Sequence, residues 1–188
     1  MSEQNYWQNF YKGFDLNGAS SFALFANKYF QTKGLFGAKL LDLGCGNGRD
    51  SYYFINTSFV VTGVDFASKL KSNQDFTFIS SDINNLVKDY VCNYDIVYSR
   101  FFLHSIPNES IVSVLKWTPR YFIAEFRAED DVPILYTNHY RNLISGSWIL
   151  KQMLDNNYEI LYFQKDHNLA VYKNENPSII RLIGRKND

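Results

Sequence analysis

Residues 38–50 read Ala-Lys-Leu-Leu-Asp-Leu-Gly-Cys-Gly-Asn-Gly-Arg-Asp. A short apolar run with a single acid, Asp42, is followed by three glycines at alternate positions and then by a segment, 49–56, that looks helical. This order predicts a strand, a glycine-rich turn and a helix, which together open a nucleotide-type α/β domain. Glycine is needed in such a turn because the backbone adopts a positive φ or approaches a ligand closely.

Two classes of cofactor use a turn of this kind. A dinucleotide site has the pattern G-x-G-x-x-G, with a pyrophosphate at the helix N-terminus, but Arg49 stands here where the last glycine would be. The Asp42 carboxylate, two residues before Gly44, would repel a pyrophosphate and suits a cofactor with a nearby cation, such as S-adenosylmethionine (SAM). Asp65 ends the next apolar run, 21 residues after Gly44, which is the spacing expected for an acid that binds ribose hydroxyls.

Three motifs in order resemble the class I SAM-dependent methyltransferases. They are the glycine-rich stretch, Val-Thr-Gly-Val-Asp-Phe at 61–66 and Ser-Ser-Asp-Ile at 80–83. The resemblance runs from about residue 3 to the C-terminus. It implies one domain over residues 1–188, with an N-terminal helical lid in residues 1–32. The implied fold class is α/β: a Rossmann-like three-layer sandwich with a seven-stranded, mostly parallel sheet whose last strand is antiparallel.

Apolar periodicity and turn residues place the individual elements. Helices are expected at 3–12, from Ser20 or Ser21 to 31, 48–56, 84–90, 108–117, and from Ser145 or Ser147 to 156. Strands are expected at 38–43, 59–64, 76–79, 94–98, 120–126, 158–164 and 178–185, with a brief pairing at 169–172.

The resemblance also implies cofactor contacts. The Asp82 carboxylate would accept from the adenine amino group while Ile83 packs on the ring; as an alternative, Asp82 caps the following helix. Aromatic residues of the first helix either close over the cofactor or cover the sheet. The implied cofactor residues are Tyr11, Asp42, Gly44, Cys45, Gly46, Arg49, Asp65, Phe66, Asp82, Ile83 and Ser99.

The acceptor site is expected in the loop after the fourth strand, because ligands of open α/β sheets lie at the carboxyl ends of strands. His104 is either a general base or a packing residue of that loop. Arg127 would act at the same edge, and the arginines either clamp an anion or pair with Glu125, Glu129, Asp130 and Asp131. The candidate acceptor residues are Arg100, His104, Arg127, His139, Tyr140 and Arg141, with His104 and Arg127 as catalytic candidates.

The chemistry of methyl transfer asks little of the protein beyond alignment, because the sulfonium is already an activated leaving group. A hydroxyl or amine acceptor also needs a base to remove its proton. A phosphate or carboxylate acceptor needs no base, but it does need cations to hold it.

The composition excludes several classes of function. Nineteen basic and nineteen acidic residues give zero net charge, which argues against nucleic acid as a partner, and the loop Ser-Arg-Phe-Phe at 99–102 lacks the Asn/Asp-Pro-Pro-aromatic base-flipping motif. No apolar run approaches the ~20 residues needed to cross a membrane, and no signal peptide is evident. Two lone cysteines and three scattered histidines indicate no disulfide framework and no metal site, and fit a reducing cytoplasm. Nothing in the sequence indicates an oligomeric state.

A weaker resemblance concerns the acceptor. Glu-Phe-Arg at 125–127, His-Tyr-Arg at 139–141 and Asn-Pro-Ser-Ile-Ile-Arg at 176–181 resemble small methyltransferases of bacterial surface-polysaccharide loci. This points to a sugar, a sugar phosphate or a related small polar, anionic acceptor. Two rivals stay open: a thiol, metalloid or xenobiotic methyltransferase, and a domain that binds SAM without catalysis.

Overall fold

The computed structural model describes residues 3–12, 18–86, 88–118, 120–131, 140–171 and 174–187. Helices and short 3-10 turns occur in the order α1 Glu3–Lys12, α2 Ser21–Thr32, α3 Arg49–Asn56, η1 Ile83–Asn85, α4 Lys88–Val91, η2 Leu103–Ser105, α5 Asn108–Trp117 and α6 Gly146–Asp155. The strands are β1 Lys39–Leu43, β2 Val60–Asp65, β3 Phe76–Ser80, β4 Ile96–Arg100, β5 Tyr121–Arg127, β6 Tyr158–Asp166 and β7 Ile179–Lys186.

The strands form one seven-stranded sheet in the order β3-β2-β1-β4-β5-β7-β6. Strands β1 to β5 run parallel to one another, and β7 lies antiparallel between β5 and β6. The predicted fold class, including the antiparallel last strand, is therefore confirmed. The strand order reverses between β1 and β4, which is where ligands of open α/β sheets bind.

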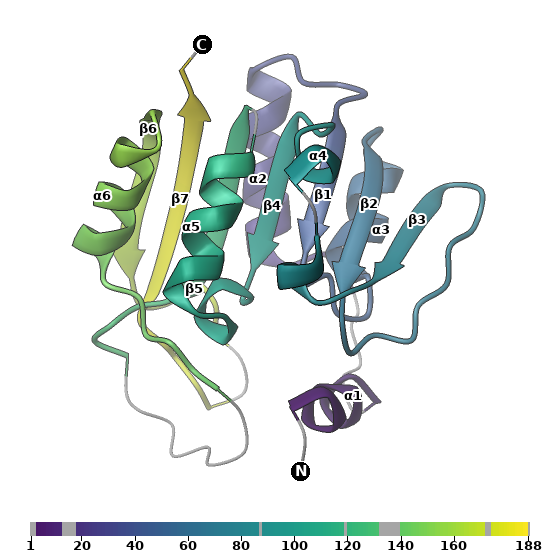
Figure 1. Cartoon of the computed structure of the whole chain (residues 1–188), viewed down its shortest axis with the longest axis horizontal. Coiled ribbons are helices and arrows are strands. Elements are labelled where there is room, and N and C mark those ends of the chain that lie inside the picture. Colours follow the sequence, from purple (N-terminus) through teal and green to yellow (C-terminus); the bar gives the residue numbers. More distant parts are fainter. Residues whose placement is uncertain are drawn as a thin grey trace.

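Helices cover both faces of the sheet. Figure 1 shows α4, α5 and α6 on the near face, with α2 and α3 behind the sheet. Successive residues of β1 alternate between the two layers, with Leu40 in the core beneath α2 and α3 and Leu41 in the core beneath α5 and α6, as the two-residue period of a strand requires. Burial on both faces explains why the parallel strands read as apolar runs.

Helix α1 is set apart from these layers. It lies below the carboxyl ends of β1 and β2 in Figure 1, whereas α2 buries Phe22, Ala26 and Phe30 against the sheet. Ser20 caps α2 by accepting a hydrogen bond from the Ala23 N–H. It is one of the two residues, Ser20 and Ser21, at which the sequence predicted that this helix begins. The lid role predicted for residues 1–32 stays a prediction, and α1 is the part that lies at the carboxyl edge.

Three expected elements differ from the structure. The helix expected at 84–90 is wrong: Asp82 caps only the 3-10 turn η1, and α4 covers just Lys88–Val91. Residues 169–171 of the expected brief pairing lie outside any strand. The fourth strand extends to Arg100 rather than ending at 98, because it pairs with β1 on one side and β5 on the other; Ser99 and Arg100 therefore belong to the strand itself.

None of the helices in the described ranges has the length and apolar character needed to cross a membrane. Neither Cys45, which is buried, nor Cys92, which is exposed, is in a disulfide with a described residue. The cytoplasmic location stays a prediction.

Candidate cofactor and acceptor site

The glycine turn between β1 and α3 has the backbone that the sequence predicts. Gly44 has φ 73° and Gly46 has φ 57°. A Cβ atom at Gly44 would lie 2.6 Å from the Phe102 side chain, and one at Gly46 would lie 2.9 Å from the Tyr11 ring. Both the conformation and the close approach therefore require glycine at these two positions.

Asp65 at the end of β2 is held rigidly beside this turn. Its Oδ1 accepts hydrogen bonds from the N–H groups of Ala67 (2.7 Å) and Ser68 (2.8 Å). Its Oδ2 accepts from the Gly46 N–H (3.1 Å) and from the Tyr11 hydroxyl (3.2 Å). The carboxylate thus faces the turn, in the position predicted for an acid that binds a ribose.

Asp42 in β1 is the second acid of the turn. It is 2% exposed, and the Ser51 hydroxyl donates to its Oδ2 at 2.6 Å. Burial raises the pKa of Asp42 to about 7, although the Ser51 bond opposes that shift. A cationic group placed nearby would stabilise the ionised carboxylate.

Asp82 and Ile83 follow β3 at the far end of the same edge. Asp82 accepts from the backbone and side-chain nitrogens of Asn84 through its Oδ1 only, so it caps the 3-10 turn η1 and not the helix expected at 84–90. No described residue donates to its Oδ2, which leaves that oxygen able to accept from an adenine. Ile83 is buried, at 6% exposed. The adenine role stays a prediction.

Asp50 forms a hub that the sequence reading missed. Its carboxylate accepts from the Ser20 N–H (2.9 Å), the Ser20 hydroxyl (2.7 Å) and the Tyr98 hydroxyl (2.8 Å), and pairs with Arg49 (3.0 Å). Although burial opposes ionisation, Arg49 and Arg100 hold the pKa of Asp50 below its ordinary value. The hub ties the start of α2 to the start of α3. In the sequence, the only sign of this role was that Asp50 stands directly after the glycine turn.

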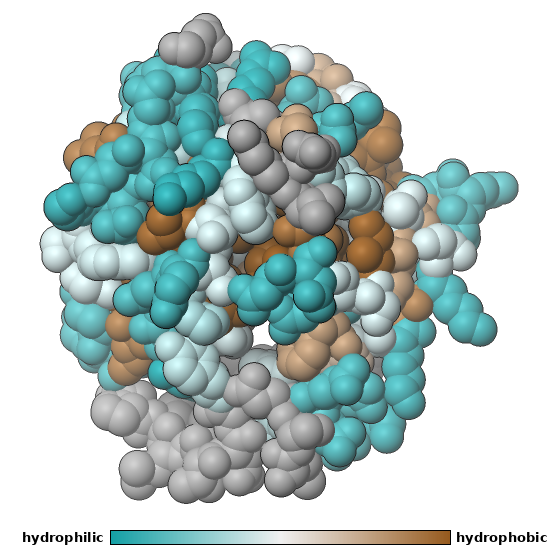
Figure 2. Space-filling model, in the orientation of Figure 1, coloured by the Kyte–Doolittle hydropathy of each residue, from teal (hydrophilic) through white to brown (hydrophobic). Residues whose placement is uncertain are grey.

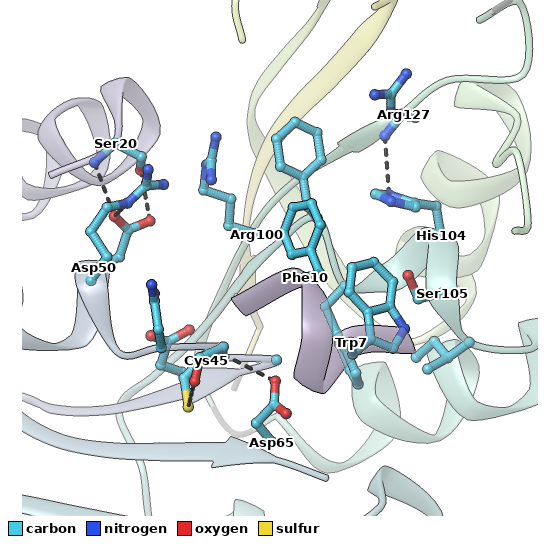
Figure 3. A pocket seen from close by; sticks show the side chains of 18 of the residues that line it. Trp7, Phe10, Ser20, Cys45, Asp50, Asp65, Arg100, His104, Ser105 and Arg127 are labelled. Atoms are coloured by element: carbon cyan, nitrogen blue, oxygen red, sulfur yellow. Dashed lines mark hydrogen bonds and ion pairs between the residues drawn. The ribbon is translucent and has the colours of Figure 1, made fainter. Parts of the chain in front are cut away.

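One cavity of about 1280 Å³ joins these residues to the predicted acceptor residues. Figure 2 shows the molecular surface hollowed in its lower half. In Figure 3, Asp65 and Cys45 lie at one end of the pocket and His104, Ser105 and Arg127 at the other, with Trp7, Phe10 and Arg100 between them. The predicted site residues that line the cavity are Tyr11, Asp42, Gly44, Cys45, Gly46, Arg49, Asp65, Phe66, Asp82, Ile83, Arg100, His104, Arg127, Tyr140 and Arg141.

Two predicted residues differ from this set. Ser99 is fully buried opposite Leu43 and is not in the cavity wall, and its hydroxyl has no hydrogen-bond partner among the described residues. His139 lies outside the described residues.

Arg100 forms an ion pair with the buried Glu125, which the sequence analysis gave as one possible partner. Its Nε donates to Glu125 at 2.9 Å, and its guanidinium lies 4.5 Å from the centre of the Phe101 ring. Glu125 is fully buried and also accepts from the Arg181 Nε at 2.6 Å. One carboxylate therefore serves two guanidinium groups, which leaves a positive charge near the cavity.

Arg127 is paired twice. It donates to Asp131 at 2.8 Å and to Glu175 at 2.5 Å. For Arg100 and Arg127 the structure thus shows the paired arrangement, rather than a clamp whose cations are free of acids. Arg141 lines the same end of the cavity, where burial and the nearby Arg127 lower the pKa of its guanidinium.

His104 follows an unusual backbone turn. Phe101 adopts φ 53°, which is rare for a bulky residue and marks a strained position of the kind found at functional sites. The chain turns there, and the His104 ring packs edge-to-face on Phe101 with 5.7 Å between ring centres. The imidazole is 4% exposed, and its Nδ1 accepts from the Arg127 N–H at 3.4 Å. The described residues contain no group of three or more acidic, histidine or cysteine side chains suited to a metal.

Comparisons with known proteins agree with this geometry. The family model described as "Tellurite resistance protein TehB" matches residues 23–121. The magnesium protoporphyrin IX methyltransferase from Synechocystis, solved with bound SAM, superposes with a TM-score of 0.70 at 16% identity, covering 100% of this chain and 98% of that one. TehB from Haemophilus influenzae superposes with a TM-score of 0.66 at 18% identity, covering 98% and 67%. At these identities the two likenesses show a shared fold.

A curated relative matches over a shorter range. The ubiquinone biosynthesis O-methyltransferase of Proteus mirabilis is 31% identical over 88 residues, which is 42% of this chain. The match covers only 36% of that relative's length.

The sheet order, the glycine turn after β1 and the acid at the end of β2, all facing one cavity, define the architecture of a class I SAM-dependent methyltransferase. Within that class, the chain belongs to the TehB family, whose model matches more than half of its length.

Proposed function

We propose that this protein transfers a methyl group from SAM to a small polar acceptor, which enters at the arginine-bearing end of the cavity. The observation that carries the proposal is the polarity of that single cavity. Three acids, Asp42, Asp65 and Asp82, and three arginines, Arg100, Arg127 and Arg141, line it. In Figure 3, Asp65 and Arg127 lie at opposite ends, with Arg100 between them. A cationic cofactor and an electron-rich acceptor would each face groups of complementary charge.

The residues at the acidic end fit SAM. Asp65 would accept hydrogen bonds from the ribose hydroxyls, and the Oδ2 of Asp82 would accept one from the adenine amino group. The Asp42 carboxylate would stabilise the positive charge of the ammonium. When bound, SAM supplies an activated methyl group, so the protein contributes alignment and exclusion of water. The cavity of about 1280 Å³ exceeds the roughly 300–1,000 Å³ of a typical ligand pocket, which gives room for a cofactor and an acceptor together.

The preferred acceptor is small and carries an anionic group. Arg100 supports this, because Glu125 is shared between two arginines and compensates only one of their charges. Sugar phosphates and related glycan precursors are one such class; they rest on the surface-polysaccharide resemblance alone, since the relatives reported above have other printed names.

A thiol, metalloid or xenobiotic acceptor is the second candidate. Membership of the TehB family favours it, and so does the aromatic wall that α1 contributes through Tyr6, Trp7 and Phe10. Replacement of Arg141 by Gln distinguishes the two: it should raise KM strongly for an anionic acceptor and leave an uncharged one unaffected.

The first test is a thermal melt with S-adenosylhomocysteine, with NAD as the control ligand. At ~100-fold excess over its dissociation constant, a ligand of the native state adds about 2.7 kcal/mol, which is roughly 5 to 10 °C for a chain of this size. We expect that shift with S-adenosylhomocysteine alone, and its loss in Asp65→Asn. A cooperative melt without any shift would refute the proposal, whereas a shift without methyl transfer to any acceptor of a broad panel would indicate a non-catalytic SAM-binding domain.

A further inference from the structure

The guanidinium group of Arg127 is held by two acids whose surroundings differ. Arg127 lies at the end of the cavity opposite Asp65 (Figure 3). Its Nη1 donates to Asp131 at 2.8 Å, and its Nη2 donates to Glu175 at 2.5 Å. The Asp131 side chain is 4% exposed, whereas that of Glu175 is 41% exposed. Both Arg127 and Glu175 line the cavity, so the second ion pair lies in its wall.

Asp131 is a structural partner of Arg127. Its Oδ1 accepts from the Ser178 N–H at 3.2 Å, and its own N–H donates to the Ala128 carbonyl at 3.1 Å. These bonds join the end of β5 to the start of β7. Separation of a buried ion pair is costly, because it leaves an uncompensated charge inside the protein. We therefore expect Asp131 to stay on Nη1 and to keep the guanidinium group in place.

The Glu175 side chain is easier to displace. It belongs to the connection between β6 and β7, where the side chain of the neighbouring Asn176 accepts from the Asn168 N–H at 2.7 Å and donates to the Asn168 side chain at 2.9 Å. The backbone beside Glu175 is therefore anchored, and a rotation of the side chain alone would release Nη2 of Arg127. An exposed carboxylate regains water when it leaves its partner, which is why exposed ion pairs contribute little to stability.

The charges at this end of the cavity compensate one another. In the part of the chain that the structure describes, two arginines, Arg127 and Arg141, lie near two acids, Asp131 and Glu175. Burial and the positive charge of Arg127 lower the pKa of Arg141, and the charges of Asp131 and Glu175 oppose that shift, so the four groups act on one another. An anion added to this group would be repelled by Glu175, whereas an anion that replaces the Glu175 carboxylate keeps both arginines compensated.

We infer that the anionic group of the acceptor replaces the Glu175 carboxylate on Nη2 of Arg127, so that Glu175 sets how tightly acidic acceptors bind. The inference rests on the proposed function and deepens it by naming the group that binds the acceptor. Glu175 shows that this nitrogen binds a carboxylate, and an acceptor carboxylate or phosphate presents arginine with the same kind of oxygen. Glu175 is thus a specificity-determining residue, because an anionic acceptor must compete with it and a neutral acceptor leaves the ion pair closed.

The exchange is tested with two simple anions, inorganic phosphate and benzoate, whose dissociation constants are measured by calorimetric titration. When a competing group closes a binding site, the apparent affinity falls with the fraction of sites that are open. We expect Glu175→Gln to bind at least one of the two anions about 3- to 10-fold more tightly than the parent, since an ion pair of this exposure has that strength. Equal or weaker binding of both anions, or no binding of either to Glu175→Gln, would overturn the inference.

Glu129→Gln is the matched control. Glu129 stands two residues after Arg127, its side chain is 39% exposed, and it pairs with Lys165 at 3.1 Å. The variant removes the same charge from a site of similar exposure. We expect its affinity for both anions to stay within about twofold of the parent, because salt screens exposed charges. A similar gain in Glu129→Gln and Glu175→Gln would show a general effect of charge and would contradict an exchange on Nη2.

A double-mutant cycle assigns the gain to Arg127. In an Arg127→Gln background, Glu175→Gln should no longer raise the affinity for either anion, because the shared donor is gone. A gain that persists in this background would refute the exchange. The melting temperature of each variant checks that it folds, and the comparison of Glu175→Gln with Glu129→Gln stands even if Arg127→Gln does not fold.

These titrations need neither cofactor nor turnover. Their failure would leave the S-adenosylhomocysteine melt, and with it the proposed function, intact. For an ionised acceptor identified in the panel, KM should fall about 3- to 10-fold in Glu175→Gln, with Glu129→Gln again as the control. A rise in KM would show that Glu175 itself binds the acceptor, which is the opposite of the inferred role.

Discussion

At the scale of the residue, Asp42 links protonation to both stability and ligand binding. Its ordinary carboxyl pKa of 3.8 rises to about 7 in the folded protein, chiefly because the side chain is buried. Between about pH 4 and pH 7, Asp42 is therefore protonated in the folded state and ionised in the unfolded state. The stability that this proton provides is present below about pH 4, is lost as the pH rises through 7, and is of the order of 4 kcal/mol.

The ammonium of a bound cofactor would make Asp42 favour its ionised form, because the positive charge stabilises the carboxylate. We expect the affinity for S-adenosylhomocysteine to rise by up to tenfold per pH unit between about pH 5 and pH 7 and then to level off. Isothermal titration at a series of pH values measures this. In Asp42→Asn the affinity should be lower and independent of pH. A flat profile in the parent protein would show that Asp42 does not contact a charged group.

At the scale of the element, α1 is tied to the cofactor edge by two side chains. The Tyr11 hydroxyl donates to Asp65 at 3.2 Å, and the Gln4 amide donates to the Phe66 carbonyl at 2.9 Å. Burial, together with the Asp65 carboxylate, raises the pKa of Tyr11 well above its ordinary value. The hydroxyl therefore stays protonated and occupies one of the four donor positions around Asp65.

A ribose that donates to the same carboxylate must displace one of those donors. Three of them are backbone N–H groups fixed by the turn and by β2, so Tyr11 is the one that yields. We expect Tyr11→Phe to bind S-adenosylhomocysteine up to ~10-fold more tightly, since a neutral hydrogen bond is worth about 0.5–1.5 kcal/mol. Tyr29→Phe in α2 is the control and should bind as the parent does. Weaker binding in Tyr11→Phe would instead identify the hydroxyl as a cofactor ligand.

At the scale of the whole molecule, Glu125 joins the parallel and antiparallel parts of the sheet. It accepts from Arg100 in β4 and from Arg181 in β7. Arg181 reaches on to the Ser21 hydroxyl of α2 and to the Leu169 carbonyl, each at 2.8 Å. A single buried carboxylate thus connects three strands, a helix and a loop, so its loss should be felt across the whole fold.

Replacement of Glu125 by Gln leaves the buried Arg181 and the partly buried Arg100 without their counter-charge. We expect the free energy of unfolding to fall by about 3–5 kcal/mol, which corresponds to roughly 10 °C in the melting temperature. The matched control is Glu159→Gln, which removes the carboxylate of an exposed pair with Arg185 and should leave the melt unchanged, because exposed pairs contribute little. Similar melts for the two variants would disprove the central role of Glu125.

Sequence reasoning succeeded where chemistry is fixed by short spacing. The glycine turn, Asp42 and Asp65 occur within 24 residues of each other. The geometry of a strand–turn–helix unit therefore largely fixes their relative positions. It failed at 84–90, where tertiary context keeps only a 3-10 turn and a four-residue helix. It also placed Ser99 and Arg100 beyond the fourth strand, because the end of a strand depends on its neighbours rather than on its own residues.

By itself, the sequence determined the class of fold, the cofactor and the edge of the sheet at which ligands bind, because these follow from local periodicity and from turn chemistry. Only the tertiary structure decided how the side chains around the acceptor end are paired. Arg100, Glu125 and Arg181 come from three strands, and the hydrogen bond that His104 Nδ1 accepts comes from the backbone of Arg127. Contacts between residues far apart in the chain leave no pattern in a single sequence, so these contacts become visible only when the strands lie side by side.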